Sequence, residues 1–254
     1  MHLLGEDIRA IWIATNHRTG SMWATNVVAA IVRAEGHPVV PERQGEADER
    51  ARTIMGLEHL RGNAKGVAVI KTHDPVPLLP SSVGVITRRD VRDATVSWMR
   101  FMRRSFARSV SFARNALART PEKLFAGEHR ILLDHELIAE NPVEAVRYLA
   151  RQLGAATAEQ AAAEIAAQFS KAVVSKIAAE ADARVMGRLA AGGKVLRNEL
   201  VVLETDNWRA RDLETSFQTG HVSDYRTGDW KHILTATQQD VLNELIEAAG
   251  HSMV

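Results

Sequence analysis

The stretch from Ile11 to Arg33 places a strand pattern, a short glycine-containing loop and a helix pattern next to one another. Residues 11–15 read IWIAT, a largely apolar run typical of a buried parallel strand. After a polar loop over residues 16–21, apolar residues recur at helical spacing from Met22 onward, and Gly36 stands where a helix commonly ends. Because the first N–H groups of a helix have no partner within it, this order of elements predicts an anion-binding loop.

The residue types in that loop indicate which anion it binds. A Walker A loop requires Gly-Lys-Ser/Thr, and the chain contains no such sequence. Residues 18–23 read Arg-Thr-Gly-Ser-Met-Trp. They resemble the 5′-phosphosulfate loop of sulfotransferases that use 3′-phosphoadenosine 5′-phosphosulfate (PAPS), usually written Pro-Lys/Arg-Ser-Gly-Thr-Thr-Trp. An ordinary strand-to-helix turn in an unrelated α/β protein is the alternative.

Composition narrows the class of protein. The chain has 254 residues, a formal net charge of +1 and no cysteine. Disulfides and cysteine-based metal or redox sites are therefore excluded, and the near-neutral charge argues against a general nucleic-acid binder. No apolar run reaches the length of a membrane span, and the N-terminus does not resemble a signal peptide. We expect one cytoplasmic domain over residues 1–254.

A second apolar run, over residues 67–70, leads into Lys71, Thr72 and His73. Polar groups that follow a parallel strand lie at the carboxyl edge of the sheet, where open α/β folds bind ligands. The Lys-Thr-His sequence resembles the corresponding segment of the sulfotransferases. In that family the histidine is the catalytic base and the lysine contacts the transferred group. A buried structural histidine is the alternative reading of His73.

A third strand pattern, over residues 83–87, is followed by Arg89, Asp93 and Ser97, which are four residues apart. An arginine at a strand end can bind phosphate oxygens with both arms of its guanidinium. Asp93 and Ser97 are about one helical turn apart and so face the same way. The spacing matches the family's 3′-phosphate motif, and it favours Arg89 over the neighbouring Arg88.

The rest of the chain gives local patterns. Helices are predicted over residues 48–60 and 235–249, and residues 130–134 predict a fourth strand. Asn141 as N-cap, with Pro142 after it, predicts a further helix that stops at Gly154. The remaining predictions are an arginine-rich amphipathic helix within residues 99–129, helices over the alanine-rich residues 155–190, and a loop over residues 191–215.

Two features of the chain concern the adenosine part of the cofactor. The family tyrosine that helps to hold adenine falls near Asp134, so this chain lacks that tyrosine. The family also has a Ser-Phe segment near the nucleotide, and two parts of this chain are candidates for it. Residues 169–170 (Phe-Ser) have the matching place in the chain order, whereas residues 215–217 (Thr-Ser-Phe) have the better matching sequence.

The C-terminal sequence Gly-Asp-Trp-Lys, over residues 228–231, resembles the end of the family's Arg-Lys-Gly-x-x-Gly-Asp-Trp-Lys motif. Ser223, Asp224 and Tyr225 stand where Arg, Lys and Gly are expected. Ser223, Arg226 and Gly228 are therefore the candidates for the 3′-phosphate contact in this segment.

Taken together, the resemblance implies a P-loop-like α/β sulfotransferase fold, with a central parallel β-sheet flanked by helices. It implies PAPS as cofactor, PAP as its product, a small-molecule acceptor with a hydroxyl or amine, and no metal. The implied catalytic residues are His73, Lys71 and Arg18. The implied cofactor-binding residues are Arg18, Thr19, Gly20, Ser21, Met22, Trp23, Arg89, Ser97, Ser223, Arg226 and Gly228.

Two other functions are compatible with these patterns. One is a P-loop-like small-molecule kinase, against which the missing Walker lysine counts. The other is a catalytically inactive nucleotide-binding relative, which the altered C-terminal motif would suit.

Overall fold

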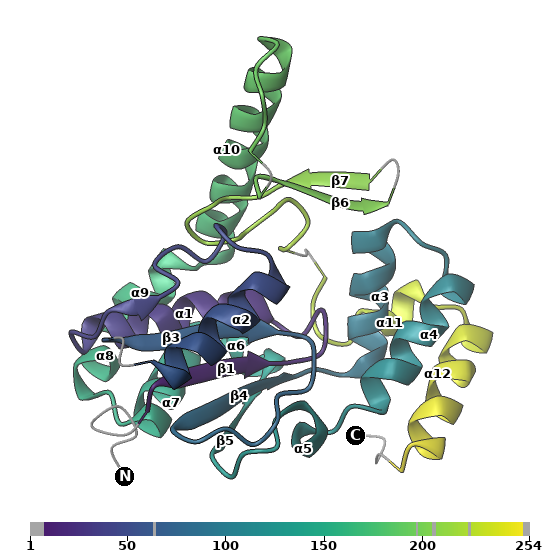
Figure 1. The fold of residues 1–254 in the computed structure, drawn as a ribbon. Coiled ribbons are helices and arrows are strands. Elements are labelled where there is room, and N and C mark those ends of the chain that lie inside the picture. The colour runs from purple at the N-terminus through teal and green to yellow at the C-terminus, as the bar shows by residue number, and fades with distance from the viewer. Residues whose placement is uncertain (1–7, 63–64, 197, 205–206, 223–224, 251–254) are drawn as a thin grey trace.

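The computed structural model describes residues 8–62, 65–196, 198–204, 207–222 and 225–250. Its centre is a five-stranded parallel sheet with the order β2-β3-β1-β4-β5 (Figure 1). The α/β class with a central parallel sheet is thus confirmed. The strands are β1 (Ala10–Ala14), β2 (Val39–Val40), β3 (Val67–Thr72), β4 (Ser82–Arg88) and β5 (Arg130–Asp134).

Helices cover both faces of this sheet because the strands are apolar on both sides. On one face Ile11, Ile13, Val69 and Val85 pack in one core with α1 (Ser21–Ala34), α7 (Pro142–Leu153), α8 (Ala156–Gln160) and α9 (Ala162–Gln168). On the other face Trp12 and Ile70 belong to a second core, which α2 (Glu49–Arg61) and the end of α5 (Pro121–Leu124) help to close.

The helix that precedes Gly154 shows how a local prediction was only partly right. The helix α7 begins at Pro142 and ends at Leu153, and Gly154 follows it with a left-handed φ of 71°. Asn141 occupies the N-cap position, but its side chain makes no capping hydrogen bond. Asn141 is also the residue that ends α6 (His135–Glu140), and its φ and ψ of −135° and 64° differ from those of an ordinary N-cap.

A third group of helices lies beside the sheet, and α12 runs next to α4 (Figure 1). The group comprises α3 (Val91–Met102), α4 (Phe106–Leu117), α11 (Trp230–Ile233) and α12 (Ala236–Ala248), which pack around Val96, Ala113 and Leu242. The arginine-rich segment predicted as one helix is the end of α3 followed by α4 and α5. Arg103, with a left-handed φ of 54°, separates α3 from α4.

The long helix α10 (Lys171–Ala190) projects from the body of the molecule, and a two-stranded antiparallel hairpin lies beside its middle (Figure 1). The hairpin strands are β6 (Leu200–Glu204) and β7 (Asn207–Ala210). The prediction of a loop over residues 191–215 was therefore wrong for these strands. Val202 lies opposite Trp208 in the hairpin, and such apolar cross-strand pairs stabilise it despite the mixed charge around them.

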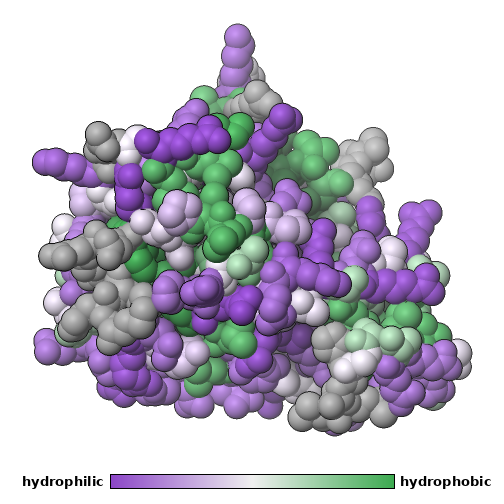
Figure 2. Space-filling model, turned by 60° about the horizontal axis from the view of Figure 1, so that its bottom comes forward, coloured by the Kyte–Doolittle hydropathy of each residue, from purple (hydrophilic) through white to green (hydrophobic). Residues whose placement is uncertain are grey.

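The surface is mixed in character. Figure 2 shows hydrophilic residues over most of one face, with hydrophobic residues gathered in smaller groups between them. In the part of the chain that the structure describes, no helix is both long enough and apolar enough to cross a membrane.

Candidate functional site

The polar residues singled out in the sequence meet at the carboxyl edge of the sheet. Strand β1 lies between β3 and β4, so the segments that follow these three strands are neighbours in space. These segments carry Arg18, Lys71 with His73, and Arg89. The chain continues to β2 and β3 on one side of β1 and to β4 and β5 on the other, which makes this edge a topological switch point.

The loop after β1 presents the N-terminus of α1 to this edge. Arg18 and Gly20 have positive φ values of 65° and 96°, and no side chain caps the helix. The first N–H groups of α1, at Ser21, Met22 and Trp23, are therefore available to an anion. Thr19 fixes the loop instead, because its Oγ1 donates to the Asn16 carbonyl (2.8 Å) and lies 2.7 Å from the hydroxyl of Thr87.

Met22 and Trp23 are both half-buried. Trp23 packs against the core on the α1 face of the sheet. Gly20 is needed at the tip of the loop for two reasons: its φ lies in the left-handed region, and a Cβ there would come within 3.0 Å of Ile138 Cδ1.

Arg18 lies across the site. Its Nε donates to the Ser97 hydroxyl (3.0 Å), its Nη2 donates to the Gly220 carbonyl (3.1 Å), and its guanidinium lies 4.5 Å from the centre of the Phe101 ring. Burial lowers the pKa of Arg18, and the positive charge of Arg89 lowers it further. Such a crowded cation is stabilised by a bound anion.

The two neighbouring arginines after β4 have different partners. Arg88 makes two hydrogen bonds of 2.8 Å to the carboxylate of Asp134, at the position where the family has its tyrosine. Arg89 instead donates from Nη1 to the Arg18 carbonyl (3.1 Å), and its buried Nε has no hydrogen-bond partner among the described residues. Arg89 is thus the arginine that contacts the loop after β1, and its Nε–H can still donate a hydrogen bond to a ligand.

Asp93 and the C-terminal segment meet directly. The Gly228 N–H donates to the Asp93 carboxylate (2.8 Å), so Asp93 orients this segment and the N–H is already engaged. Burial raises the pKa of Asp93, while the hydrogen bond from Gly228 opposes that shift. Arg226 is exposed, and its backbone N–H donates to Asp229. Ser223 lies outside the described residues.

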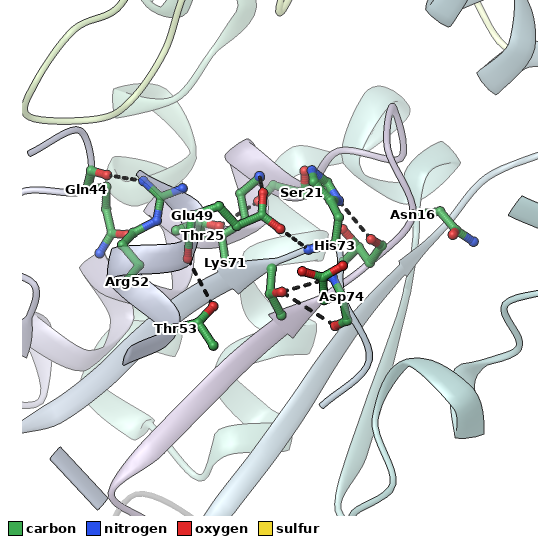
Figure 3. A network of polar contacts seen from close by, with 12 residues as sticks. Asn16, Ser21, Thr25, Gln44, Glu49, Arg52, Thr53, Lys71, His73 and Asp74 are labelled. Carbon is green, nitrogen blue, oxygen red and sulfur yellow. Dashed lines mark hydrogen bonds and ion pairs between the residues drawn. The ribbon is translucent and has the colours of Figure 1, made fainter. Parts of the chain in front are cut away.

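Lys71 and His73 form the third part of the site, joined by a carboxylate that the sequence did not reveal (Figure 3). Glu49 Oε2 lies 3.6 Å from Lys71 Nζ, and Glu49 Oε1 accepts a hydrogen bond from the His73 backbone N–H. The His73 Nδ1 lies 2.9 Å from the Thr15 carbonyl oxygen. Because a carbonyl only accepts, Nδ1 carries the proton and Nε2 has the free lone pair.

Burial shifts both titratable groups. It lowers the pKa of Lys71 to about 8, although Glu49 opposes the shift. Burial and the charge of Lys71 hold the pKa of His73 well below its usual value, so that His73 is neutral at pH 7. At pH 7 the ring of His73 is therefore neutral, with a nitrogen that can accept a proton, while Lys71 is mainly in its positively charged form.

An aromatic wall, consisting of His17, Trp98 and Phe112, borders His73. The rings of His17 and His73 are 3.6 Å apart, His17 lies 5.2 Å from Trp98, and Trp98 stacks on Phe112 at 4.8 Å. Arg119 closes the same side, since its Nη1 donates to the His73 carbonyl (2.6 Å). No sequence pattern indicated that these residues border His73, apart from the place of His17 beside Arg18.

The two segments proposed for the adenosine side lie together. Phe169 and Phe217 have ring centres 6.5 Å apart, and the Thr215 carbonyl accepts a hydrogen bond from Asn26 on α1. Ser170 caps α10 through a bond from the Val173 N–H. The candidate with the matching place in the chain order and the candidate with the better matching sequence thus belong to one region of the structure.

Among the described residues, no group of three or more His, Cys, Asp or Glu side chains is placed to share a metal ion.

No protein-family model and no curated protein matches the sequence. Solved structures do match. Mouse sulfotransferase SULT7A1 complexed with PAP aligns with a TM-score of 0.58 and 16% identity, over 96% of this chain and 86% of that chain. Retinol dehydratase with androsterone and the inactive cofactor PAP aligns with a TM-score of 0.57 and 15% identity, over 97% and 83% of the two chains. The same enzyme with retinol and PAP gives 0.56 and 15%, over 97% and 84%. The chain has the sulfotransferase fold.

Proposed function

We propose that this chain is a PAPS-dependent sulfotransferase, which moves a sulfuryl group from PAPS to a hydroxyl or amine of a small-molecule acceptor. One observation carries the proposal: three strand ends bring Arg18, the Lys71–His73 pair and Arg89 to one sheet edge, around the uncapped N-terminus of α1. The fold, shared with structures that hold PAP, supports it.

The residues present suit a ligand with two separated phosphate groups. The N–H groups of residues 20–23 and the Arg18 guanidinium would hold the 5′-phosphate. Arg89, whose buried Nε lacks a partner among the described residues, and the Ser97 hydroxyl would hold the 3′-phosphate. PAPS supplies the activated sulfuryl group, and the protein positions it and neutralises charge on the leaving phosphate.

The base and the positive charge of the proposed reaction would come from the carboxyl end of β3 and the residue that follows it. His73 Nε2 would take the proton from the acceptor, because Nδ1 is held by the Thr15 carbonyl and the ring is neutral. Lys71 would stabilise the negative charge of the transferring group. Glu49 contacts both residues and so fixes their relative position.

Nucleotide binding separates this function from that of a kinase. We expect isothermal titration to show micromolar binding of PAP without Mg²⁺, and weaker binding of ATP with or without Mg²⁺. Tighter binding of ATP in the presence of Mg²⁺ would favour the kinase instead. Absence of binding for every nucleotide would contradict the proposed function.

A further inference from the structure

Two arginines that are buried or half-buried, Arg52 and Arg211, have no role in the proposed cofactor site. Arg52, on α2, is buried, with 4% of its surface exposed. Its Nη1 donates to the carbonyls of Gln44 (2.6 Å) and Ala47 (2.8 Å), while its buried Nε has no hydrogen-bond partner among the described residues. The two carbonyls take up only part of its capacity to donate, because a guanidinium has five N–H groups.

The second arginine, Arg211, follows β7. In the described part of the chain its guanidinium makes no ion pair within 4.0 Å, and its buried Nε is unpaired. The segment that follows Arg211 pairs with the segment that Arg52 holds, because the N–H groups of Gln44 and Gly45 donate to the carbonyls of residues 214 (2.9 Å) and 213 (2.8 Å). Burial lowers the pKa of Arg52 to about 10, and the charge of Arg211 contributes to that shift. Asp48 and Glu49 offset this only in part, and Glu49 already contacts Lys71.

The position of Arg52 separates it from the residues assigned to the nucleotide. Arg18 and Arg89 follow β1 and β4, whereas Arg52 lies on the helix that leads from β2 to β3, on the opposite side of Lys71. Figure 3 shows Arg52 beside Glu49 and Lys71, on the side away from Ser21 and Asn16. A buried cation without a counter-charge costs free energy, and an anion bound between the two would offset that cost.

We propose that Arg52 and Arg211 form a second anion subsite, which takes an acidic group of the acceptor, such as a carboxylate or phosphate. The proposal rests on the proposed function, since it assigns PAPS to the other side of Lys71. The acceptor is then an anionic hydroxyl or amino compound, held by its acid at Arg52 and Arg211.

The test is isothermal titration of inorganic phosphate into the PAP-saturated protein, with ionic strength held constant by NaCl. We expect a dissociation constant on the order of 1 mM, weakened at least tenfold by Arg211→Gln. The matched control is Arg50→Gln, an exposed arginine on the same helix, which should change it less than twofold. Arg52→Gln should act like Arg211→Gln, but Arg211→Gln decides, because Arg52 also holds the Gln44 and Ala47 carbonyls.

Other results would overturn the proposal. These are no binding of phosphate, an equal loss in Arg50→Gln, or a loss of PAP affinity in Arg211→Gln. Exclusion of phosphate when PAPS replaces PAP would assign the two arginines to the sulfuryl group and not to the acceptor. Failure of the proposed function looks different: PAP does not bind, and phosphate binding to the nucleotide-free protein is lost in Arg18→Gln but not in Arg211→Gln.

Discussion

Arg18 donates a hydrogen bond from its Nε to the hydroxyl oxygen of Ser97, 3.0 Å away, although 79 positions separate the two residues. One residue comes from the loop after β1 and the other from α3. The bond therefore links the proposed 5′-phosphate and 3′-phosphate sites, and it gives a direct way to separate their contributions.

Ser97→Ala should weaken PAP binding by about tenfold, or about 1.4 kcal/mol, because a phosphate contact is lost. The affinity for adenosine 5′-monophosphate (AMP), which has no 3′-phosphate, should stay within twofold. Titration of both nucleotides measures this, with Ser111→Ala, an exposed serine on α4, as the control. Equal weakening of both nucleotides would mean that Ser97 acts through Arg18.

Glu49→Gln should move the alkaline limb of the pH–rate profile to lower pH. In the proposed mechanism Lys71 acts in its protonated form, so activity should fall as the pH rises through its pKa of about 8. Glu49 raises that pKa, and its removal lowers it further. The measurement is kcat/KM from pH 6.5 to 9.5 for wild type, Glu49→Gln and the exposed control Glu58→Gln. A limb that stays in place in Glu49→Gln contradicts the role of Glu49.

His73 should remain neutral well below pH 6.5. Its pKa is lowered by burial and by Lys71, so protonation, and with it the loss of a base, occurs only at more acidic pH. Histidine NMR resonances followed from pH 5 to 8, with His73→Gln to assign the signal, measure this without an acceptor. An ordinary titration near pH 6.5 would show that His73 is solvated and not held as the structure has it.

Gly56→Ala should destabilise the protein by about 1–3 kcal/mol, because added volume in a packed contact is costly. A Cβ at Gly56 would lie 2.7 Å from Ile70 Cγ1 and 3.1 Å from Trp12 Cη2, where α2 meets the sheet. Urea unfolding gives the value. Gly187→Ala, on α10 with nothing within 4 Å, serves as the control and should be neutral or stabilising. Similar stability for both variants would contradict the tight packing of α2.

The parts of the site that the sequence predicted are local ones. Lys71 lies near the end of a buried strand, Arg89 directly follows one, and Arg18 lies in the short loop after one. Parallel strands bring such positions to one edge whatever lies between them. The choice of Arg89 over Arg88 came from the spacing to Ser97 alone, and the structure pairs Arg88 with Asp134 instead.

The parts that could not be predicted depend on contacts between distant segments. Glu49 lies in a charged helix pattern like any other, and only the fold brings it to the His73 N–H. The positions of Arg119 and Arg211 in the fold could not be predicted either, because the chain has many arginines and most of those described lie on the surface. The hairpin of β6 and β7 is a different case, because its two strands are close in the sequence and were missed since they are short and carry charges.

The most direct test of the proposed function is the dependence of nucleotide affinity on the 3′-phosphate. Isothermal titration of the wild-type protein with PAP and with AMP measures it. We predict micromolar PAP binding, at least tenfold tighter than AMP, a difference of about 1.4 kcal/mol or more. Equal affinities for the two nucleotides, or no binding of PAP, would contradict the assignment of Arg89 and Ser97 and with it the use of PAPS.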